Sequence, residues 1–478
     1  MSDTTAPELD APAPLAAMSL SQVLSAMSRA LDLTEGQPAG HTLRTCAIGM
    51  RLGAEVGLDD DARSALYYAL LLKDAGCSSN AERFATLFGT ADQTVKYRMK
   101  FTDWHRSGHL ALRTATTVAR GRTLGVRARH FLRIARTEDM TRSLIQIRCD
   151  RGAAIALHLG FPEAAADAIR NLDEHWCGRG YPAGRRGDQI PLLARIANLA
   201  QCVEIFHARA GREAALRVAR KRRGTWFDPK LVDLLLRWRN DHAWWDELRS
   251  PEILERVVAE EPGDRVRTVD EEGLDALAGA FAEIVDAKSP FTFCHSTNVA
   301  RYARAVAEQV GMNAAEQRRL YRAGLLHDVG KLGVSSNILE KRGPLSPAER
   351  KDMERHPLYT WEILSPVEAF RGFARMAALH HEKLDGSGYP WGVSGDGLEP
   401  AARILCVADI YEALTADRPY RAGMPHGVAM DILHRESGTQ LCAQAVAGLA
   451  AWVDAERPPP RQFHEVEAGR PVDADQPE

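Results

Sequence analysis

The chain rarely alternates apolar and polar residues in the way that a half-buried strand requires, and alternating β-branched runs are scarce. Its apolar positions are dominated by Ala and Leu and lie among Arg and Glu, all of which favour helices. We therefore predict an all-α fold, including helices at about 20–33 and 270–287. No apolar run approaches the roughly 20 residues that a membrane span requires, so no membrane partner is expected.

The sequence pattern repeats once along the chain. A Gly-x-Gly-Tyr-Pro string ends at Pro182 and recurs 208 positions later, ending at Pro390. Nearer the N-terminus, "LLKDAG" at 71–76 recurs as "LLHDVG" at 325–330, which is an offset of 254 positions. The two offsets differ by 46, so the first copy carries about that many extra residues, within about 80–147.

The repeat predicts tandem helical bundle domains with a boundary near Pro262, where turn residues interrupt a charged stretch. Polar, Pro-rich composition predicts disorder at both ends of the chain. The predicted division is a disordered lead-in at 1–18, a first domain at 19–262 with its insertion at about 80–147, a second domain at 263–457, and a disordered tail at 458–478.

Charge is distributed unevenly around the insertion. Residues 91–148 hold 13 Lys and Arg against four acidic residues, although the whole chain has a net charge of −3. Two interpretations remain open: a surface for an anion or a partner, or an arginine-rich, solvated helix pair whose alkyl stems cover a core. We favour the second, because no aromatic interleaving accompanies the charge. No nucleic-acid partner is expected.

The N-terminus lacks the basic region and apolar core of a signal peptide. The eight cysteines are scattered and form no Cys-x-x-Cys pair, which argues against a zinc ribbon or a disulfide framework. We expect all eight to be small buried apolar residues in a reducing cytoplasm.

The second copy contains a concentration of potential metal ligands. Neutral imidazole and carboxylate groups hold Fe, Mn, Co, Ni and Zn, and their affinity order alone does not select one of these metals. Two adjacent metals can clamp both oxygens of a phosphoryl displacement. Seven ligands, one of them an Asp able to bridge, are about what such a pair needs. The seven are His295, His327, Asp328, His356, His380, His381 and Asp409.

The first copy lacks most of these ligands. Lys73 stands at the position of His327, Arg148 at that of His356, and Leu172-Asp173 at that of His380-His381. Gln201 stands at the position of Asp409. Only His41 and Asp74 remain, and the added positive charge would repel a cation. We predict no catalytic metal there.

Five segments of the second copy resemble the HD-GYP family, a subgroup of the HD phosphohydrolase superfamily. The resemblance implies helices around a metal centre and hydrolysis of cyclic di-GMP to the linear dinucleotide pGpG, to GMP or to both. The matching strings are "DAKSPFTFCHS" at 286–296, "GLLHDVGKLGV" at 324–334, "HP" at 356–357, "HHEKLDGSGYP" at 380–390 and "ARILCVADIYEALTADRPYR" at 402–421.

The resemblance also assigns roles to the seven candidate ligands. Family members with a third metal carry a Glu four residues before the first histidine ligand, and Phe291, which cannot bind a metal, stands at that position here. We therefore expect two divalent metal ions. Fe or Mn is preferred, with Zn, Co and Ni as alternatives. The matching ligands are His295, His327 and Asp409 for one metal, His356, His380 and His381 for the other, and Asp328 as the bridge.

The family resemblance also implies which residues contact the substrate. Lys331 matches the family's phosphate-contacting lysine, and the loop Gly388-Tyr389-Pro390 matches the loop that shapes the substrate site. Arg418 and Arg421 are candidates for contact with the second phosphate or with guanine. Tyr389 either stacks on a base or packs beneath the loop, and the sequence favours neither interpretation. Asp328 and Lys331 are the predicted catalytic residues.

Adjacent ligands constrain the local structure. His327 and Asp328 would point about 100° apart on a regular helix, so both reach one centre only at a helix end. Gly330 and Gly333 indicate such an end. His380 and His381 pose the same problem, and turn residues Asp385-Gly386 follow them.

Two other functions remain open. The chain could be a nucleotide-binding regulatory or scaffold protein, with the first domain contacting a signalling protein or a second copy of the chain. It could also be an HD phosphohydrolase that acts on another nucleotide or phosphoester, because a fold alone does not fix a substrate.

Overall fold

The computed structural model describes residues 18–120, 122–136, 138–263, 267–289, 294–417 and 422–455. Within these ranges the regular secondary structure is helical apart from two strands of two residues each, which confirms the all-α prediction. The tail predicted to be disordered, 458–478, and most of the lead-in, 1–18, lie outside the described residues. Met18 is the exception to the predicted lead-in, because it begins a strand.

The N-terminal half, residues 18–263, contains a long series of helices joined by short turns. Its elements are β1 Met18–Ser19, α1 Leu20–Thr34, α2 His41–Glu55, α3 Asp60–Leu72, η1 Cys77–Asn80, α4 Ala81–Phe88, α5 Asp92–Lys100, α6 Ser107–Thr117, α7 Leu124–Ala135, α8 Glu138–His158, α9 Glu163–Arg170, η2 Gly187–Gln189, α10 Leu192–Arg222, α11 Pro229–Arg237, η3 Trp238–Asn240, α12 His242–Glu247 and α13 Ile253–Ala259.

The C-terminal half, residues 267–455, begins with the second strand and also consists of helices. Its elements are β2 Thr268–Val269, α14 Glu271–Asp286, α15 His295–Gln309, α16 Ala314–Leu326, η5 Val329–Gly333, α17 Ser336–Leu339, α18 Pro347–Met353, α19 His356–Leu364, η6 Glu368–Phe370, α20 Arg371–Ala378, η7 Gly395–Gly397, α21 Pro400–Thr415, α22 His426–Glu436 and α23 Ala443–Ala455.

The helices that open the two halves occur where the sequence predicts them. Ser19 begins α1 with a capping box, because its hydroxyl accepts from the backbone N–H of Gln22 while the Gln22 side chain accepts from that of Ser19. Asp270 begins α14, and its carboxylate accepts from the N–H of Gly273 at 2.8 Å. The predicted helices at 20–33 and 270–287 are therefore confirmed.

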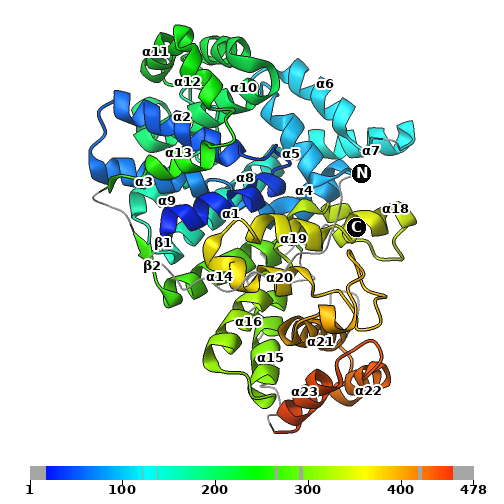
Figure 1. The fold of residues 1–478 in the computed structure, drawn as a ribbon. Helices are drawn as coiled ribbons and strands as arrows, with labels where there is room; N and C mark the ends of the chain where they lie inside the picture. Colours follow the sequence, from blue (N-terminus) through cyan, green and yellow to red (C-terminus); the bar gives the residue numbers. More distant parts are fainter. Residues whose placement is uncertain are drawn as a thin grey trace, which may run out of the picture.

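The two halves lie one above the other and share an interface through α1 and α19 (Figure 1). β1 pairs with β2 in antiparallel fashion, with Met18 opposite Val269. One continuous cluster of buried apolar side chains runs through both halves, from Leu20 to Val453. The predicted domain boundary near Pro262 stays a prediction, but the two halves do not have separate cores.

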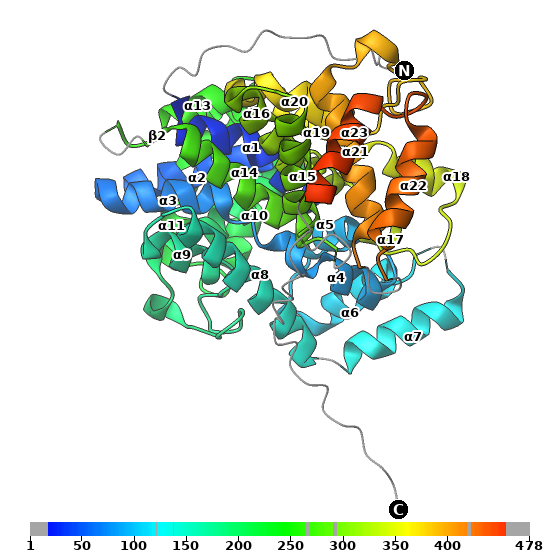
Figure 2. The same ribbon diagram turned by 90° about the horizontal axis from the view of Figure 1, so that it is seen from below.

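The insertion differs from its prediction. It forms α4, α5, α6 and α7 and the start of α8 rather than a helix pair, and it flanks the N-terminal half (Figure 2). It has a small core of its own, which includes Phe88, Val95 and Leu144. Lys96 is buried and Lys100 is nearly so, whereas they were expected in solvent. The cause is a set of buried carboxylates that these ammonium groups neutralise.

Two further expectations concern composition. Within the described residues, no helix is both long and apolar enough to cross a membrane. All eight cysteines are free thiols, and five of them are buried. The expectation of eight buried cysteines is wrong for Cys294, which is exposed at the start of α15, and Cys177 and Cys442 are only partly buried.

Candidate metal centre

The seven predicted ligands converge on one place in the C-terminal half. Six lie at helix ends, as the adjacent pairs require. His295 begins α15, and His356 begins α19. His327 follows α16, and Asp328 precedes η5. His380 and His381 follow α20, whereas Asp409 lies inside α21.

A first group of side chains contains His295, His327 and Asp409, whose ligand atoms lie within 4.8 Å of one another. His295 Nε2 is 3.4 Å and His327 Nε2 is 3.8 Å from Asp409 Oδ1. Both imidazole nitrogens are also 3.3 Å from Asp328 Oδ2. This group comes from three different helices of the bundle.

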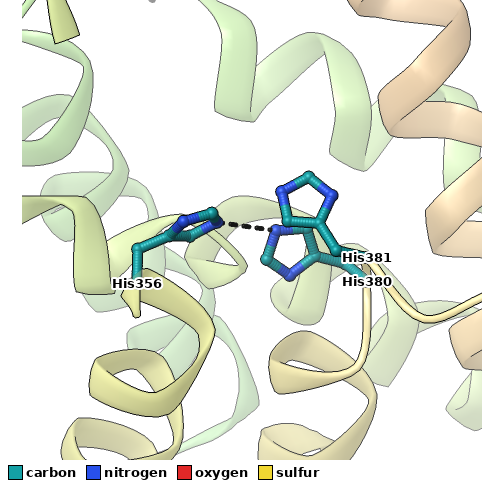
Figure 3. Close-up of side chains that lie close together, drawn as sticks. All are labelled: His356, His380 and His381. Atoms are coloured by element: carbon teal, nitrogen blue, oxygen red, sulfur yellow. Dashed lines mark hydrogen bonds between the residues drawn. The ribbon is translucent and has the colours of Figure 1, made fainter. Parts of the chain in front are cut away.

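A second group contains His356, His380 and His381, also within 4.8 Å (Figure 3). His356 Nε2 is 3.2 Å from His380 Nε2. The other carboxylate oxygen of Asp328, Oδ1, is 3.4 Å from His356 and 3.7 Å from His380. Asp328 therefore presents one oxygen to each group, which is the arrangement that a bridging ligand needs.

Three of the imidazoles are held by the same local contact. The Nδ1 atoms of His327, His356 and His380 each lie 2.7 Å from a backbone carbonyl three residues earlier. A carbonyl can only accept, so Nδ1 carries the proton and Nε2 presents its lone pair to the centre. The position of each histidine at a helix end thus fixes its orientation.

Burial sets the charge of the second group. It lowers the pKa of His356 and His380 to about 3 and that of His381 well below its usual range. Neutral imidazole is the form that binds a metal. For His295 burial acts in the same direction, but the carboxylates of Asp328 and Glu412 outweigh it and raise the pKa to about 10.

The residues present fit a metal pair. His295 Nε2, His327 Nε2 and Asp328 Oδ1 are buried and have no hydrogen-bond partner among the described residues. A buried polar atom without a partner costs about 1–3 kcal/mol, and all three atoms point into the same centre. Cations at this place would satisfy them.

Lys331 and the glycine loop border the centre. Lys331 Nζ lies 2.5 Å from Asp328 Oδ2, and its side chain is 19% exposed. The Tyr389 ring packs 4.7 Å from that of His381, centroid to centroid, and its backbone N–H donates to the His381 carbonyl. A Cβ on Gly388 would lie 2.5 Å from the Glu382 Cα, so this close approach requires glycine. Pro390 follows a cis peptide bond.

Two acidic residues near this loop shape it. Glu382 accepts from the N–H groups of Trp391, Gly392 and Val393 at 2.8–3.2 Å. Asp385 accepts from the N–H and hydroxyl of Ser387. Three other predicted positions, Phe291, Arg418 and Arg421, lie outside the described residues.

Two supporting residues were not identified from the sequence. Glu412 Oε2 is 2.6 Å from His295 Nδ1 and takes the place that a backbone carbonyl has at His327, His356 and His380. Thr360 accepts from the Gly330 N–H and donates to the His327 carbonyl at 2.8 Å. A signal for Glu412 was present, because Glu204 stands 208 positions earlier. The carboxylate of Glu204 contacts His41 Nδ1.

The corresponding place in the N-terminal half is filled by protein cations. Lys73 Nζ lies 3.1 Å from His41 Nε2 and is paired with the Asp74 carboxylate. By the 254-position offset, those are the counterparts of His295 and Asp328. Arg148 pairs with Asp173 in the same region. Lysine and arginine side chains thus occupy the place that the candidate metals would occupy in the other half.

A family model described as an HD domain matches residues 132–231 and 279–443. The chain is 42% identical over 437 residues to the 3'3'-cGAMP-specific phosphodiesterase 3 of Vibrio cholerae, covering 90% of this chain and 94% of that protein. It is 35% identical over 161 residues to a cyclic di-GMP phosphodiesterase response regulator of Xanthomonas campestris, covering 33% of this chain and 42% of that protein.

The chain is also similar to a solved phosphodiesterase structure. The crystal structure of a cyclic GMP-AMP-specific phosphodiesterase of V. cholerae superimposes with a TM-score of 0.63 at 36% identity, covering 92% of this chain and 98% of that chain. The likeness therefore extends through both halves and is not confined to the candidate metal centre.

Proposed function

Because the chain belongs to the HD-GYP group of the HD domain family, we propose that it is a metal-dependent phosphodiesterase that hydrolyses 3'3'-cGAMP. The observation that carries this proposal is the convergence of five histidines and two aspartates on one buried centre, with Asp328 facing both imidazole groups. The proposed metal ligands are the seven residues described above, in two groups joined by Asp328.

The choice of substrate rests on how far each similarity extends. The resemblance of the motifs implied cyclic di-GMP. The relative that is similar over 90% of the chain is named for 3'3'-cGAMP, whereas the X. campestris cyclic di-GMP phosphodiesterase matches over 33%. Cyclic di-GMP therefore becomes the second candidate substrate, and the two differ only in one purine base.

Two divalent ions bound at this centre supply Lewis-acid activation of water and of the phosphoester. The protein contributes orientation, because backbone carbonyls lock three imidazoles with Nε2 facing inward. It also contributes a low-dielectric wall, because His327, His356 and His380 are each at most 1% exposed.

Lys331 is the proposed phosphate contact. Its side chain is more exposed than that of the buried Asp328 beside it, which supports a contact between Lys331 and a substrate entering from solvent. An ammonium group there stabilises negative charge as it develops on a non-bridging phosphate oxygen. The Tyr389 ring packs against His381 and is only partly exposed, so any contact with substrate would use the part of the ring that remains accessible.

The test is hydrolysis by the full chain after loading with Mn(II) or Fe(II), followed by nucleotide chromatography and a count of bound metal. We expect wild type to cleave 3'3'-cGAMP faster than cyclic di-GMP and to bind about two metals per chain. Asp328→Ala removes the carboxylate shared by both groups and should lower kcat by at least about 1,000-fold.

The outcomes separate the alternatives. Faster cleavage of cyclic di-GMP would overturn the choice of substrate but keep the reaction. Two bound metals without cleavage of either dinucleotide would point to another phosphoester. A chain that binds no metal would contradict the proposed reaction itself.

A further inference from the structure

Helix α5 of the insertion hydrogen-bonds to the catalytic turn from the N-terminal half, which also packs against this turn through α1. This turn is residues 328–334, which contain Asp328, η5 and Lys331. The Gln93 side-chain amide, near the start of α5, donates to the carbonyl oxygens of Leu332 at 3.3 Å and Val334 at 3.1 Å. The neighbouring Asp92 is fully buried and accepts from the backbone N–H of Ser336 at 3.0 Å.

The remaining contacts show how the catalytic turn is held. On one side, the Thr360 hydroxyl accepts from the Gly330 N–H and donates to the His327 carbonyl. On another, the buried ammonium of Lys288 donates to the Leu332 carbonyl at 2.6 Å. Both residues belong to the C-terminal half. The contacts of α5 are therefore a support for the turn that comes from more than 200 residues away in the sequence.

The Gln93 contact borders open space. A cavity of about 490 Å³ lies between the two halves, and its lining includes Gly36, Gln93, Gly333 and Val334. A Cβ on Gly36 would lie 2.8 Å from the Gln93 Cβ, so Gln93 is confined on that side. If its amide were lost, the Leu332 carbonyl would keep its bond from Lys288, and water in the cavity would replace the amide at the Val334 carbonyl.

The rest of α5 is anchored in the N-terminal half. Lys96 donates to the carbonyls of Thr34 and Cys77, and Lys100 lies 2.8 Å from Glu35. These hydrogen bonds and this ion pair fix the helix from which Asp92 and Gln93 project. A rigid helix can position a partner to within a fraction of an ångström, which a surface loop cannot do.

We propose that Gln93 and Asp92 are positioning residues for the catalytic turn, so that the N-terminal half forms part of the scaffold of the metal centre although it supplies no ligand. The term catalytic turn rests on the proposed function, the hydrolysis of 3'3'-cGAMP at this metal centre. The turn carries both Asp328 and Lys331, and a displacement of about 1 Å at a reacting group can lower a rate by about 100-fold.

The test uses Gln93→Glu in the full chain, because this change keeps the shape of the side chain and removes the donor. We expect kcat for 3'3'-cGAMP to fall about ten-fold with KM unchanged within about two-fold, and the Mn(II) concentration for half loading to rise. Gln93→Lys restores a donor and should recover most of both values.

Gln317→Glu is the matched control. Gln317 is also partly buried and donates to a backbone carbonyl, that of Met312 at 2.8 Å, but at the start of α16. Its variant should keep the kcat and Mn(II) affinity of wild type. A structural effect alone would lower the melting temperature of both variants similarly and leave their kcat values equal.

The proposal is overturned if Gln93→Glu matches wild type within about two-fold in kcat and in Mn(II) half loading, or if Gln317→Glu loses as much as Gln93→Glu. If wild type cleaves no cyclic dinucleotide, the proposed function fails, and the Mn(II) titration alone then decides the positioning role. In that case, equal affinity of Gln93→Glu and wild type for Mn(II) overturns it.

Discussion

His295 differs from three of the other four candidate histidine ligands in what holds its second nitrogen. His327, His356 and His380 use a backbone carbonyl, whereas His295 Nδ1 is 2.6 Å from the Glu412 carboxylate. A carboxylate partner makes an imidazole a stronger ligand than a carbonyl partner does. Glu412 therefore sets both the orientation and the basicity of this one ligand.

We predict that Glu412→Gln keeps the fold and weakens metal binding by about 10–100-fold, because the amide supplies no negative charge to His295. The measurement is an Mn(II) titration of the full chain. Glu308→Gln is the control, since Glu308 is exposed on α15, the helix that His295 begins. Equal Mn(II) affinity of Glu412→Gln and wild type would show that the carboxylate is dispensable.

The residue types of the site could be predicted from the sequence, but the partners of their supporting residues could not. Adjacent pairs such as His327-Asp328 are visible because both members are ligand types and lie next to each other. Glu412 and Gln93 are not visible in this way. Glu412 is 117 residues from His295, and Gln93 is 239 residues from Leu332. Their partners are selected by tertiary packing, which no local pattern records.

Helix ends place the ligands, and the glycines that follow them have a second role. The sequence predicted that Gly330 ends a helix, and α16 does end at Leu326. In addition, a Cβ on Gly330 would lie only 1.9 Å from the His356 carbonyl oxygen. The turn thus approaches α19 so closely that only glycine fits. This second requirement is tertiary and was not predictable from the local sequence.

The same junction in the N-terminal half, between α3 and η1, carries Lys73. The sequence predicted that this lysine would repel a cation. The structure shows in addition that its ammonium group contacts His41 and Asp74, which are both buried. The lost metal site is therefore replaced by an internal ion pair, which leaves no unpaired charge at Asp74.

We predict that Lys73→Met destabilises the chain by about 3–5 kcal/mol, because it leaves the Asp74 carboxylate buried without its closest cation. Urea unfolding of the metal-free protein measures this. Lys221→Met, at an exposed position in the same half, should change the unfolding free energy by less than about 0.5 kcal/mol. A loss for Lys73→Met no larger than for Lys221→Met would refute the structural role of the ion pair.

At the scale of the whole molecule, the sequence repeat and the packing give different pictures. The repeat predicts two domains, and paired contacts support it, such as His41 with Glu204 and His295 with Glu412. The buried apolar cluster, however, runs through both halves without interruption. Sequence patterns show which residues are apolar but not which of them pack together, so the shared core could not be predicted.

A shared core has a thermodynamic consequence that can be measured. Metal bound to the C-terminal half stabilises the folded chain by about 2.7 kcal/mol at 100 times its dissociation constant. In the N-terminal half, Lys73 and Arg148 pair with the carboxylates of Asp74 and Asp173. If the halves folded independently, chelation would lower the melting temperature of one half and leave that of the other unchanged. If they fold as one unit, the single transition should move as a whole.

We predict one calorimetric transition for the Mn(II)-loaded full chain and one transition, at a lower temperature, after chelation. Its calorimetric and van't Hoff enthalpies should agree in both states. Asp328→Ala is the control, because its transition should not respond to Mn(II). Two transitions, of which only one shifts on chelation, would contradict the prediction and restore two independent domains. A single shifting transition would mean that metal loading is sensed throughout the chain, including at α5, whose Gln93 contacts the catalytic turn.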